Sequence, residues 1–309
     1  MSTTAFMFPG QGTQTVGMGR ALAAAFPEAR AVFEEADEAL GEPFSKLCWE
    51  GPEDDLALTR NTQPAILIAS IAALRVLEAH TALRPKVALG HSLGEISALV
   101  AVGSIRFWTA VRLARLRGRA MQEAAPEGGG AMAAVLGLAV EEVERMCLEA
   151  TTETELVCPA NLNGGNQIVV AGHAGAVERL AELAHDADAR VIALKVSAPF
   201  HCPLMQPAAE QLREWLDKVD IAELRAPVIS CVDAEPNADR DRVRELLVAQ
   251  VTHRVRWEES VRKAIHMGCE RGIELGNGKV LRNLNRRIDK RFAMFNLGEP
   301  EDLDRLPKD

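Results

Sequence analysis

Tyrosine is absent from the sequence, and aromatic residues make up only 4% of its 309 positions. Six cysteines are present, but they form no CxxC pair and show no spacing typical of metal ligands. In a chain of this length, scattered cysteines indicate reduced thiols in a cytosolic protein. We therefore expect a cytoplasmic protein without a metal site.

The distribution of basic and apolar residues also predicts no leader peptide and no membrane-spanning segment. Residues 1–7 contain no basic stretch followed by a long apolar run, and no window approaches the length of a membrane span. Positive charge is in the minority, since 35 lysines and arginines face 44 aspartates and glutamates, for a net charge of −9. The acidic balance argues against nucleic acid or a membrane as the main partner. Anionic ligands are not excluded, because a site can be locally basic within an acidic chain.

Nucleotide and zinc-protease signatures are absent too. The loop Pro9-Gly10-Gln11-Gly12 lacks the third glycine of a dinucleotide fingerprint and the Gly-Lys-Ser/Thr of a P-loop. Gly276 to Lys279 also matches neither the dinucleotide fingerprint nor the P-loop, and the zinc-protease motif HExxH does not occur. A glycine loop after a buried strand can instead present backbone N–H groups to an oxyanion.

The chain does carry strand-turn-helix units, and 48% hydrophobic residues support a large core. Residues 4–8 predict a short buried strand, and residues 65–77 have helical spacing. Residues 86–89 form an apolar run that stops at Gly90, and a helix pattern starts near Glu95. Such units build parallel α/β sheets.

The composition breaks at residues 127–130, and the order of elements then changes. The predicted elements that follow are, in order, a strand, a helix, two strands, a helix and a strand, at 131–138, 141–150, 155–158, 167–171, 174–186 and 190–196. This βαββαβ order is ferredoxin-like. We predict an α/β fold: a larger parallel-sheet, hydrolase-like domain (1–128 and 199–309) with an inserted ferredoxin-like subdomain (129–198).

Gly90-His91-Ser92-Leu93-Gly94 matches the GxSxG nucleophile elbow. A serine hydroxyl there must stand out of a tight strand-to-helix turn, and side chains at the glycine positions would clash. The apolar run before the motif and the helix pattern after it are the required context. The alternative is a glycine turn with an incidental serine.

A nucleophilic serine needs a base, and seven histidines are available. His91 sits inside the elbow and is expected to point away from Ser92. His201 is bracketed by Pro199 and Pro203, which restrict a loop that must hold one geometry. Position alone leaves two interpretations open for His201: a catalytic base, or a turn histidine without a chemical role.

Residues 106–124 predict an amphipathic helix with Arg117 in the middle of its apolar face. The other arginines of this segment are expected on the opposite, solvated face: Arg112, Arg115 and Arg119. A buried guanidinium must meet an anion. An internal Asp or Glu and a substrate carboxylate are equally compatible with the pattern.

Together these motifs resemble the malonyl-CoA:acyl-carrier-protein transacylase family, including the stand-alone acyltransferases of fatty-acid and polyketide synthesis. The similarity spans nearly the whole chain and keeps motif order and spacing. The matching segments are 8–14, 62–65, 90–95, 115–118, 130–134, 167–172, 198–201 and 255–257.

The resemblance implies a role for each matching position. Ser92 looks like the nucleophile that carries the acyl ester, and His201 like its general base and later general acid. The family orients this histidine with a backbone carbonyl and not a carboxylate, and Gln250 matches that position. The backbone N–H groups of Gln11 and Leu93 look like the oxyanion hole.

The resemblance also implies a substrate pocket. Arg117 looks like the clamp on the malonyl carboxylate, and Gln63 and Asn161 match positions near the acyl group. Met121 and Phe200 are expected to contact substrate as well. The bulky ring of Phe200, directly before the histidine, should crowd a branch at the α-carbon and favour malonyl over methylmalonyl.

The implied reaction is ping-pong acyl transfer from malonyl-CoA to the phosphopantetheine thiol of an acyl carrier protein, without a permanently bound cofactor. We expect a monomer, because nothing in the sequence suggests otherwise. One alternative is a hydrolase with the same Ser92 and His201 and water as acceptor. Another is a non-catalytic carrier-binding module. Arg117 separates the first two, because a hydrolase of uncharged acyl groups would not need a buried cation.

Overall fold

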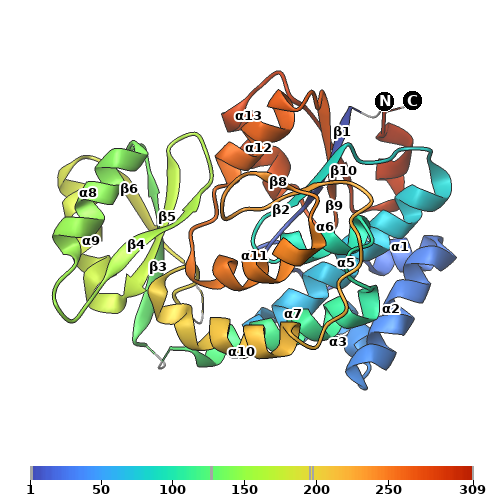
Figure 1. Ribbon diagram of the computed structural model, residues 1–309, viewed down its shortest axis with the longest axis horizontal. Helices are drawn as coiled ribbons and strands as arrows, with labels where there is room; N and C mark the ends of the chain where they lie inside the picture. The colour runs from blue at the N-terminus through green and yellow to red at the C-terminus, as the bar shows by residue number, and fades with distance from the viewer. Residues whose placement is uncertain (1–2, 126–127, 195, 197, 308–309) are drawn as a thin grey trace.

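The computed structural model describes residues 3–125, 128–194, 196 and 198–307, and these residues build two separate β-sheets (Figure 1). The larger sheet has six strands in the order β10-β9-β1-β2-β7-β8. Their bounds are Thr4–Phe8 (β1), Val87–Gly90 (β2), Val228–Ile229 (β7), Pro236–Asn237 (β8), Arg271–Leu275 (β9) and Ala293–Leu297 (β10). All neighbours pair in parallel except β8, which is antiparallel to β7.

Strand β1 lies in the middle of this sheet and is buried along its whole length. Its side chains alternate between two cores. Phe6 and Phe8 join the larger core, whereas Ala5 and Met7 join a second core on the other face. A central parallel strand covered on both faces reads as a continuous apolar run, which is why residues 4–8 were predictable.

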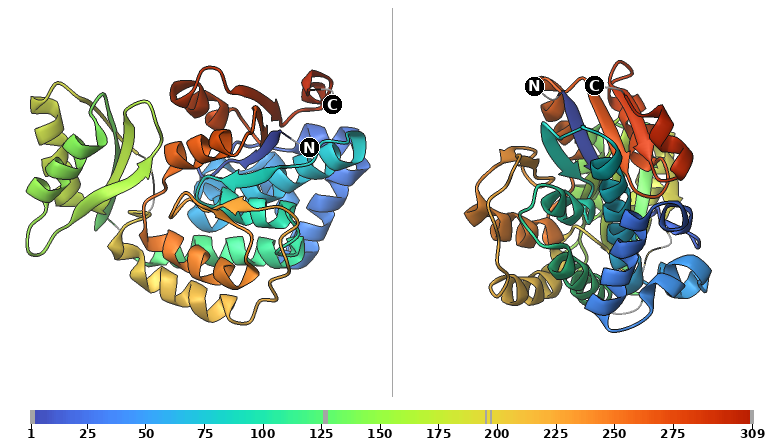
Figure 2. Two further views of the ribbon diagram at one scale, coloured as in Figure 1. Left: turned by 45° about the horizontal axis from the view of Figure 1, so that its top comes forward. Right: turned by 90° about the vertical axis from the view of Figure 1, so that its right-hand side faces the viewer.

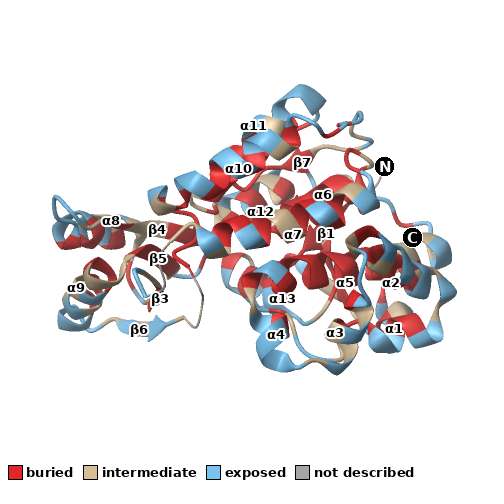
Figure 3. Ribbon diagram, turned by 90° about the horizontal axis from the view of Figure 1, so that it is seen from below, coloured by how far each residue is buried: buried red, intermediate tan, exposed pale blue. Residues whose placement is uncertain are grey.

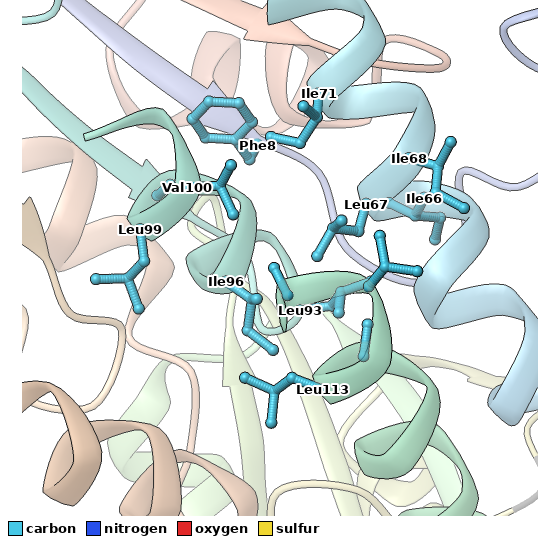
Figure 4. Close-up of a cluster of buried hydrophobic side chains, with 14 of the residues drawn as sticks. Phe8, Ile66, Leu67, Ile68, Ile71, Leu93, Ile96, Leu99, Val100 and Leu113 are labelled. Carbon is cyan, nitrogen blue, oxygen red and sulfur yellow. The ribbon is translucent and has the colours of Figure 1, made fainter. Parts of the chain in front are cut away.

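Helices cover both faces of the large sheet. Their bounds are Arg20–Ala25 (α1), Pro27–Leu40 (α2), Phe44–Glu50 (α3), Glu53–Ala57 (α4), Thr59–His80 (α5), Gly94–Ala101 (α6), Phe107–Glu123 (α7), Gln206–Leu216 (α10), Arg240–Thr252 (α11), Trp257–His266 (α12) and Val280–Ile288 (α13). Figure 4 shows the larger core, in which residues of α5, α6 and α7 pack against Phe8.

Helix α5 has the length and apolar composition to cross a membrane, contrary to our expectation that no segment would. Of its 18-residue apolar window, 83% is buried inside the protein. The helix therefore serves as the central core helix, packed against α2 and α7. All six cysteines are free thiols, as predicted.

The second sheet is antiparallel, with the order β4-β5-β3-β6. Its strands are Gly130–Leu136 (β3), Val157–Leu162 (β4), Gln167–His173 (β5) and Arg190–Ala193 (β6), and its helices are Val140–Ala150 (α8) and Ala174–Asp186 (α9). The βαββαβ order and the α/β class agree with the prediction. Strand β6 ends earlier than the predicted 190–196, a range that includes residue 195 outside the described part.

The small sheet with α8 and α9 stands to one side of the large sheet (Figure 2). Figure 3 shows that α8 and α9 bury one face and expose the other. A short link joins the two units: Val255, just before α12, donates from its N–H to the Ala160 carbonyl at 2.8 Å and accepts from the Leu162 N–H at 2.8 Å. Strand β4 is thereby attached to the large unit.

Candidate active site

The turn between β2 and α6 presents Ser92. A Cβ at Gly90 would lie 1.8 Å from the carbonyl carbon of Gly94, and a Cβ at Gly94 would lie 2.0 Å from the Phe8 carbonyl oxygen. Only glycine therefore fits at either position. Ser92 itself has φ 52°, in the left-handed region that other residues rarely adopt. This geometry places the hydroxyl at the positive N-terminal end of α6.

His201 lies beside the serine, although 109 residues separate them. Its Nε2 is 2.7 Å from Ser92 Oγ, and its Nδ1 is 2.8 Å from the carbonyl oxygen of Gln250. A carbonyl can only accept, so Nδ1 carries the proton and Nε2 is free to accept from the serine hydroxyl. His201 also has a left-handed backbone, with φ 61°. The structure thus brings Ser92, His201 and Gln250 together in the order expected of a nucleophile, a base and an orienting group.

Burial lowers the pKa of His201 to about 3, with a further contribution from the positive charge of Arg117. The imidazole is therefore neutral near pH 7, as a general base must be. Because the side chain is only 4% exposed, water competes little for its nitrogen atoms.

Arg117 extends from α7 into the same site and is 2% exposed. Its Nη2 donates to Ser92 Oγ at 3.1 Å and to Gln250 Oε1 at 2.8 Å, and its Nη1 donates to Gln63 Oε1 at 2.8 Å. Burial lowers the pKa of Arg117 to about 10, so the group stays cationic at neutral pH. Within the part of the chain that the structure describes, all of its acceptors are uncharged.

Glu95 is an internal acid of the kind that the sequence left open as a partner of Arg117, and it acts indirectly. Its Oε2 accepts from Gln250 Nε2 at 2.9 Å and from the Cys231 N–H at 2.9 Å. The Gln250 amide lies between the carboxylate and the guanidinium. Burial raises the pKa of Glu95, while these hydrogen bonds oppose the rise.

Gln250 has two functions in this network, because its backbone oxygen contacts His201 and its side chain contacts Arg117. We predicted only the first. Glu95 was not predicted as a site residue, although a carboxylate in the apolar run of α6 signals a buried polar contact.

A cavity of about 310 Å³ opens at these groups, between the two sheets. Gln250 does not line the cavity but contacts two residues that do, His201 and Arg117. The other nine of the ten predicted site residues line it: Gln11, Gln63, Ser92, Leu93, Arg117, Met121, Asn161, Phe200 and His201. The small unit contributes Met132, Asn161 and Leu194, so neither unit encloses the cavity alone.

Gln11 and Leu93 line this cavity, and the structure gives their backbone N–H groups no acceptor among the described residues. The Leu93 side chain is directed into the larger core (Figure 4), which leaves its backbone as the part that borders the cavity. Both N–H groups are therefore available to a developing oxyanion.

One expectation, for an arginine, needs correction, whereas His91 is a borderline case. His91 is among the residues that line the cavity, but its ring contacts residues other than Ser92: Nε2 is 2.9 Å from Asn163 Oδ1, and the ring lies 5.6 Å from that of Trp257. Arg115 is not on the solvated face of α7. It is half-buried, pairs with Glu42 and lies 4.8 Å above the Phe44 ring. Helices α2 and α3 cover that side of α7, and the sequence pattern did not predict them.

Comparison with known proteins agrees with this geometry. The chain matches the family model described as acyl transferase domain over residues 5–287. It is 45% identical over 305 residues to malonyl CoA-acyl carrier protein transacylase of Bacillus subtilis (strain 168), covering 98% of this chain and 96% of that protein.

Solved structures of similar proteins agree with the sequence comparison. Acyl-carrier-protein-S-malonyltransferase from Bartonella henselae superimposes with a TM-score of 0.95 at 44% identity, covering 99% of this chain and 98% of that one. A malonyl-transacylase solved in complex with its type II PKS acyl-carrier protein gives a TM-score of 0.95 at 40% identity and 97% coverage of both chains.

Proposed function

We infer, because this chain belongs to the acyl transferase family, that it transfers the malonyl group from malonyl-CoA to the phosphopantetheine thiol of an acyl carrier protein. It would thus act as an acyl-carrier-protein S-malonyltransferase of fatty-acid or polyketide synthesis. The relatives carry that activity in their names, and the arrangement of the site explains how this chain would perform it.

The observation that carries the proposal is the environment of Arg117. The guanidinium is buried, positively charged and bound only to amide and hydroxyl oxygens. A cation in such a place is stabilised when a carboxylate enters the cavity. An acyl group that ends in a carboxylate and lies within reach of Ser92 fits this requirement.

The first half-reaction uses the serine and the histidine. His201 Nε2 takes the hydroxyl proton while Ser92 Oγ bonds to the thioester carbonyl carbon. The N–H groups of Gln11 and Leu93 stabilise the oxyanion. The carbon–sulfur bond then breaks, and CoA leaves as a thiol with the proton that His201 returns.

The second half-reaction runs in reverse with a new thiol. His201 accepts the proton of the phosphopantetheine thiol, whose sulfur attacks the ester carbon. The bond from carbon to Ser92 Oγ breaks, and His201 returns the proton to the serine. Arg117 holds the malonyl carboxylate through both steps, so the acyl group keeps one orientation.

The remaining elements of the proposal concern the whole enzyme. We propose that it works in the cytoplasm as a monomer, without a permanently bound cofactor, since CoA and phosphopantetheine arrive with the two substrates. We also propose a division at 128/129 and 198/199 into the large catalytic domain and the small subdomain. The four strands of the small sheet, which all lie between 130 and 193, support it.

Intact-protein mass spectrometry tests the proposal. After brief mixing with malonyl-CoA, a malonyl adduct should form on the wild type, be absent from Ser92→Ala and be scarce with acetyl-CoA. Added holo carrier protein should remove the adduct and become malonylated. Steady release of free CoA without an adduct would instead support the hydrolase, and no reaction at all would support a non-catalytic binding module.

A further inference from the structure

Glu95 is a buried acid beside the active site to which the mechanism above assigns no step. It lies in the first turn of α6, directly after the elbow, and is 2% exposed. Its Oε2 accepts from the Cys231 N–H and from Gln250 Nε2, both at 2.9 Å. A carboxylate buried without a partner destabilises a protein, so a charged Glu95 must be compensated by a cation.

The groups around the Glu95 carboxylate stabilise its charged form. Both hydrogen bonds at Oε2 come from donors, the backbone N–H of Cys231 and the side-chain amide of Gln250. Burial raises the pKa of Glu95, and hydrogen bonds from Cys231, Gln250 and Ser230 oppose that rise. A protonated acid would itself need an acceptor in place of one of these donors. The geometry therefore favours an ionised carboxylate.

Arg117 is the cation that compensates this charge. Gln250 Oε1 accepts from Arg117 Nη2 at 2.8 Å, so a single amide group separates the carboxylate from the guanidinium. Burial lowers the pKa of Arg117, and the negative charge of Glu95 opposes that shift. The cavity on another side of Glu95 has a volume of only about 10 Å³, which is too small for a hydrated cation.

The Gln250 amide keeps the two charges close without direct contact. A carboxylate bonded to the guanidinium would occupy the N–H donors that a malonyl carboxylate needs. Across an amide, the Coulomb attraction persists, because it decays only with the inverse of distance in a buried site. Arg117 is left with neutral acceptors, among them Gln63 and Ser92, which an entering carboxylate can replace.

The same arrangement limits how tightly the site binds its substrate. A malonyl carboxylate brings a second anion to a cation that Glu95 already partly compensates. Because like charges repel strongly at low dielectric, Glu95 weakens the hold of Arg117 on the malonyl group. A weaker hold favours turnover, since the malonylated product must break its contact with Arg117 before it leaves.

We propose that Glu95 is a positioning residue of the malonyl clamp: through Gln250 it supplies the counter-ion of Arg117 in the empty site and limits the affinity for the malonyl carboxylate. This inference rests on the proposed function, because it concerns the acyl group that Arg117 holds. It adds a determinant of acyl selectivity that lies outside the cavity wall.

Glu95→Gln tests the proposal by removing the charge and keeping the shape. The new amide oxygen can still accept from the Cys231 N–H and from Gln250. Glu274→Gln is the matched control. Glu274 is 0% exposed, and its carboxylate likewise accepts from backbone N–H groups (Leu281 and Arg282) and from a side-chain amide (Asn296), but it does not line the active-site cavity.

Thermal unfolding gives the first readout. We expect Glu95→Gln to lower the Tm of the wild type, because it leaves Arg117 buried without a counter-ion. In an Arg117→Ala background the same change should raise Tm, because it then removes a buried anion that has lost its partner. Glu274→Gln should shift Tm by the same amount in both backgrounds.

The first half-reaction gives a second readout that does not require Arg117→Ala to fold. We expect Glu95→Gln to lower the KM for malonyl-CoA on the order of threefold to tenfold, since the repulsion from Glu95 is gone. Formation of acetyl-Ser92 from acetyl-CoA should not change. The malonyl-to-acetyl ratio of kcat/KM therefore rises in Glu95→Gln and stays at the wild-type value in Glu274→Gln.

Two results would overturn the inference. One is a Tm shift from Glu95→Gln that is equal in the two backgrounds, which would mean that Glu95 and Arg117 act independently. The other is a malonyl-to-acetyl ratio that is unchanged or lowered, as expected if Glu95 only supports the fold. Failure of the proposed function is distinguishable, because the wild type would then form no malonyl-Ser92, whereas the Tm comparison needs no substrate.

Discussion

At the scale of single residues, the site depends on how few contacts Arg117 makes with charged groups. Its hydrogen bonds to Gln63 and Gln250 fix the direction of the guanidinium without neutralising it. The Gln250 amide is held in turn by Glu95. In the proposed mechanism, this fixed, unneutralised cation beside Ser92 selects for acyl groups with a carboxylate, because an uncharged acyl group would leave it buried and unpaired.

Replacing Arg117 should affect activity toward charged acyl groups more than activity toward uncharged ones. We expect Arg117→Ala to lower kcat/KM for malonyl-CoA by about 100-fold or more, since losing one partner of a buried charged contact costs about 2–5 kcal/mol. Turnover of acetyl-CoA should stay equal or rise. Arg112→Ala is the control, an exposed position on the same helix that should leave both substrates unaffected. Parallel losses for malonyl and acetyl in Arg117→Ala would refute a carboxylate clamp.

Phe200 is the residue in the cavity wall that we expect to set tolerance for branching. The residue is 7% exposed and directly precedes His201. Phe200→Ser should increase the ratio of methylmalonyl-CoA to malonyl-CoA turnover by about tenfold, in the range of one methyl group in an apolar pocket. Competition assays with both CoA esters measure this ratio. An unchanged ratio in a folded variant would show that another group limits the α-carbon.

At the scale of elements, the strand-turn-helix from β2 to α6 positions Ser92 through close backbone contact. The sequence predicted this unit, and β1, α7 and α9 match their predicted spans to within a residue. Helices α1, α3 and α4 were not assigned, because segments of five to seven residues carry little periodicity. Helix α2 was not assigned either, although its buried residues have helical spacing (29, 32, 33, 36 and 39). Helix α13 does carry apolar residues at helical spacing (281, 284 and 288), a signal that we did not use.

The contact between α6 and β1 can be tested with one methyl group. Gly94→Ala should lower the free energy of unfolding by about 1–3 kcal/mol and abolish adduct formation on Ser92, because the new Cβ would meet the Phe8 carbonyl. Ser97→Ala in the same helix is the control. Its buried hydroxyl has no partner among the described residues, so its loss should be neutral or stabilising. Thermal unfolding of the two variants measures the change in stability, and mass spectrometry measures the adduct on Ser92. A Gly94→Ala variant that is as stable and active as the wild type would rule out the close contact.

At the scale of the whole molecule, burial of neutral histidines links folding to pH. Burial lowers the pKa of His201 to about 3 and also lowers the pKa of His91, from 6.5 in both cases. Below pH 6.5 the unfolded chain therefore binds protons that the folded chain does not. The stabilisation is complete above pH 6.5 and is lost as the pH falls toward 3. Glu95 and Glu274 act in the opposite direction, because burial raises their pKa.

A difference measurement isolates the histidine contribution. The free energy of unfolding of the wild type should fall below pH 6.5 more steeply than that of His201→Asn, by about 1.4 kcal/mol per pH unit. Denaturant titrations between about pH 7.5 and about pH 5 give both slopes. Equal slopes would mean that His201 titrates normally in the folded protein.

The sequence by itself predicted the βαββαβ order of the small sheet and its helices, the strand-turn-helix around Ser92 and a parallel sheet in the rest of the chain. These features depend on local periodicity and glycine placement, which neighbouring residues encode. It also singled out Arg117, whose place in an apolar stripe required an anion. It left His201 open, because a loop flanked by prolines does not show what it faces.

Only the tertiary structure decided which groups meet. Ser92 and His201 are 109 residues apart and Gln250 is 49 residues further, so their contacts depend on how the chain returns from the small sheet to the large one. The same holds for Glu95 behind Gln250. Contacts between distant segments are set by packing of the two sheets, and no periodicity along the chain encodes them.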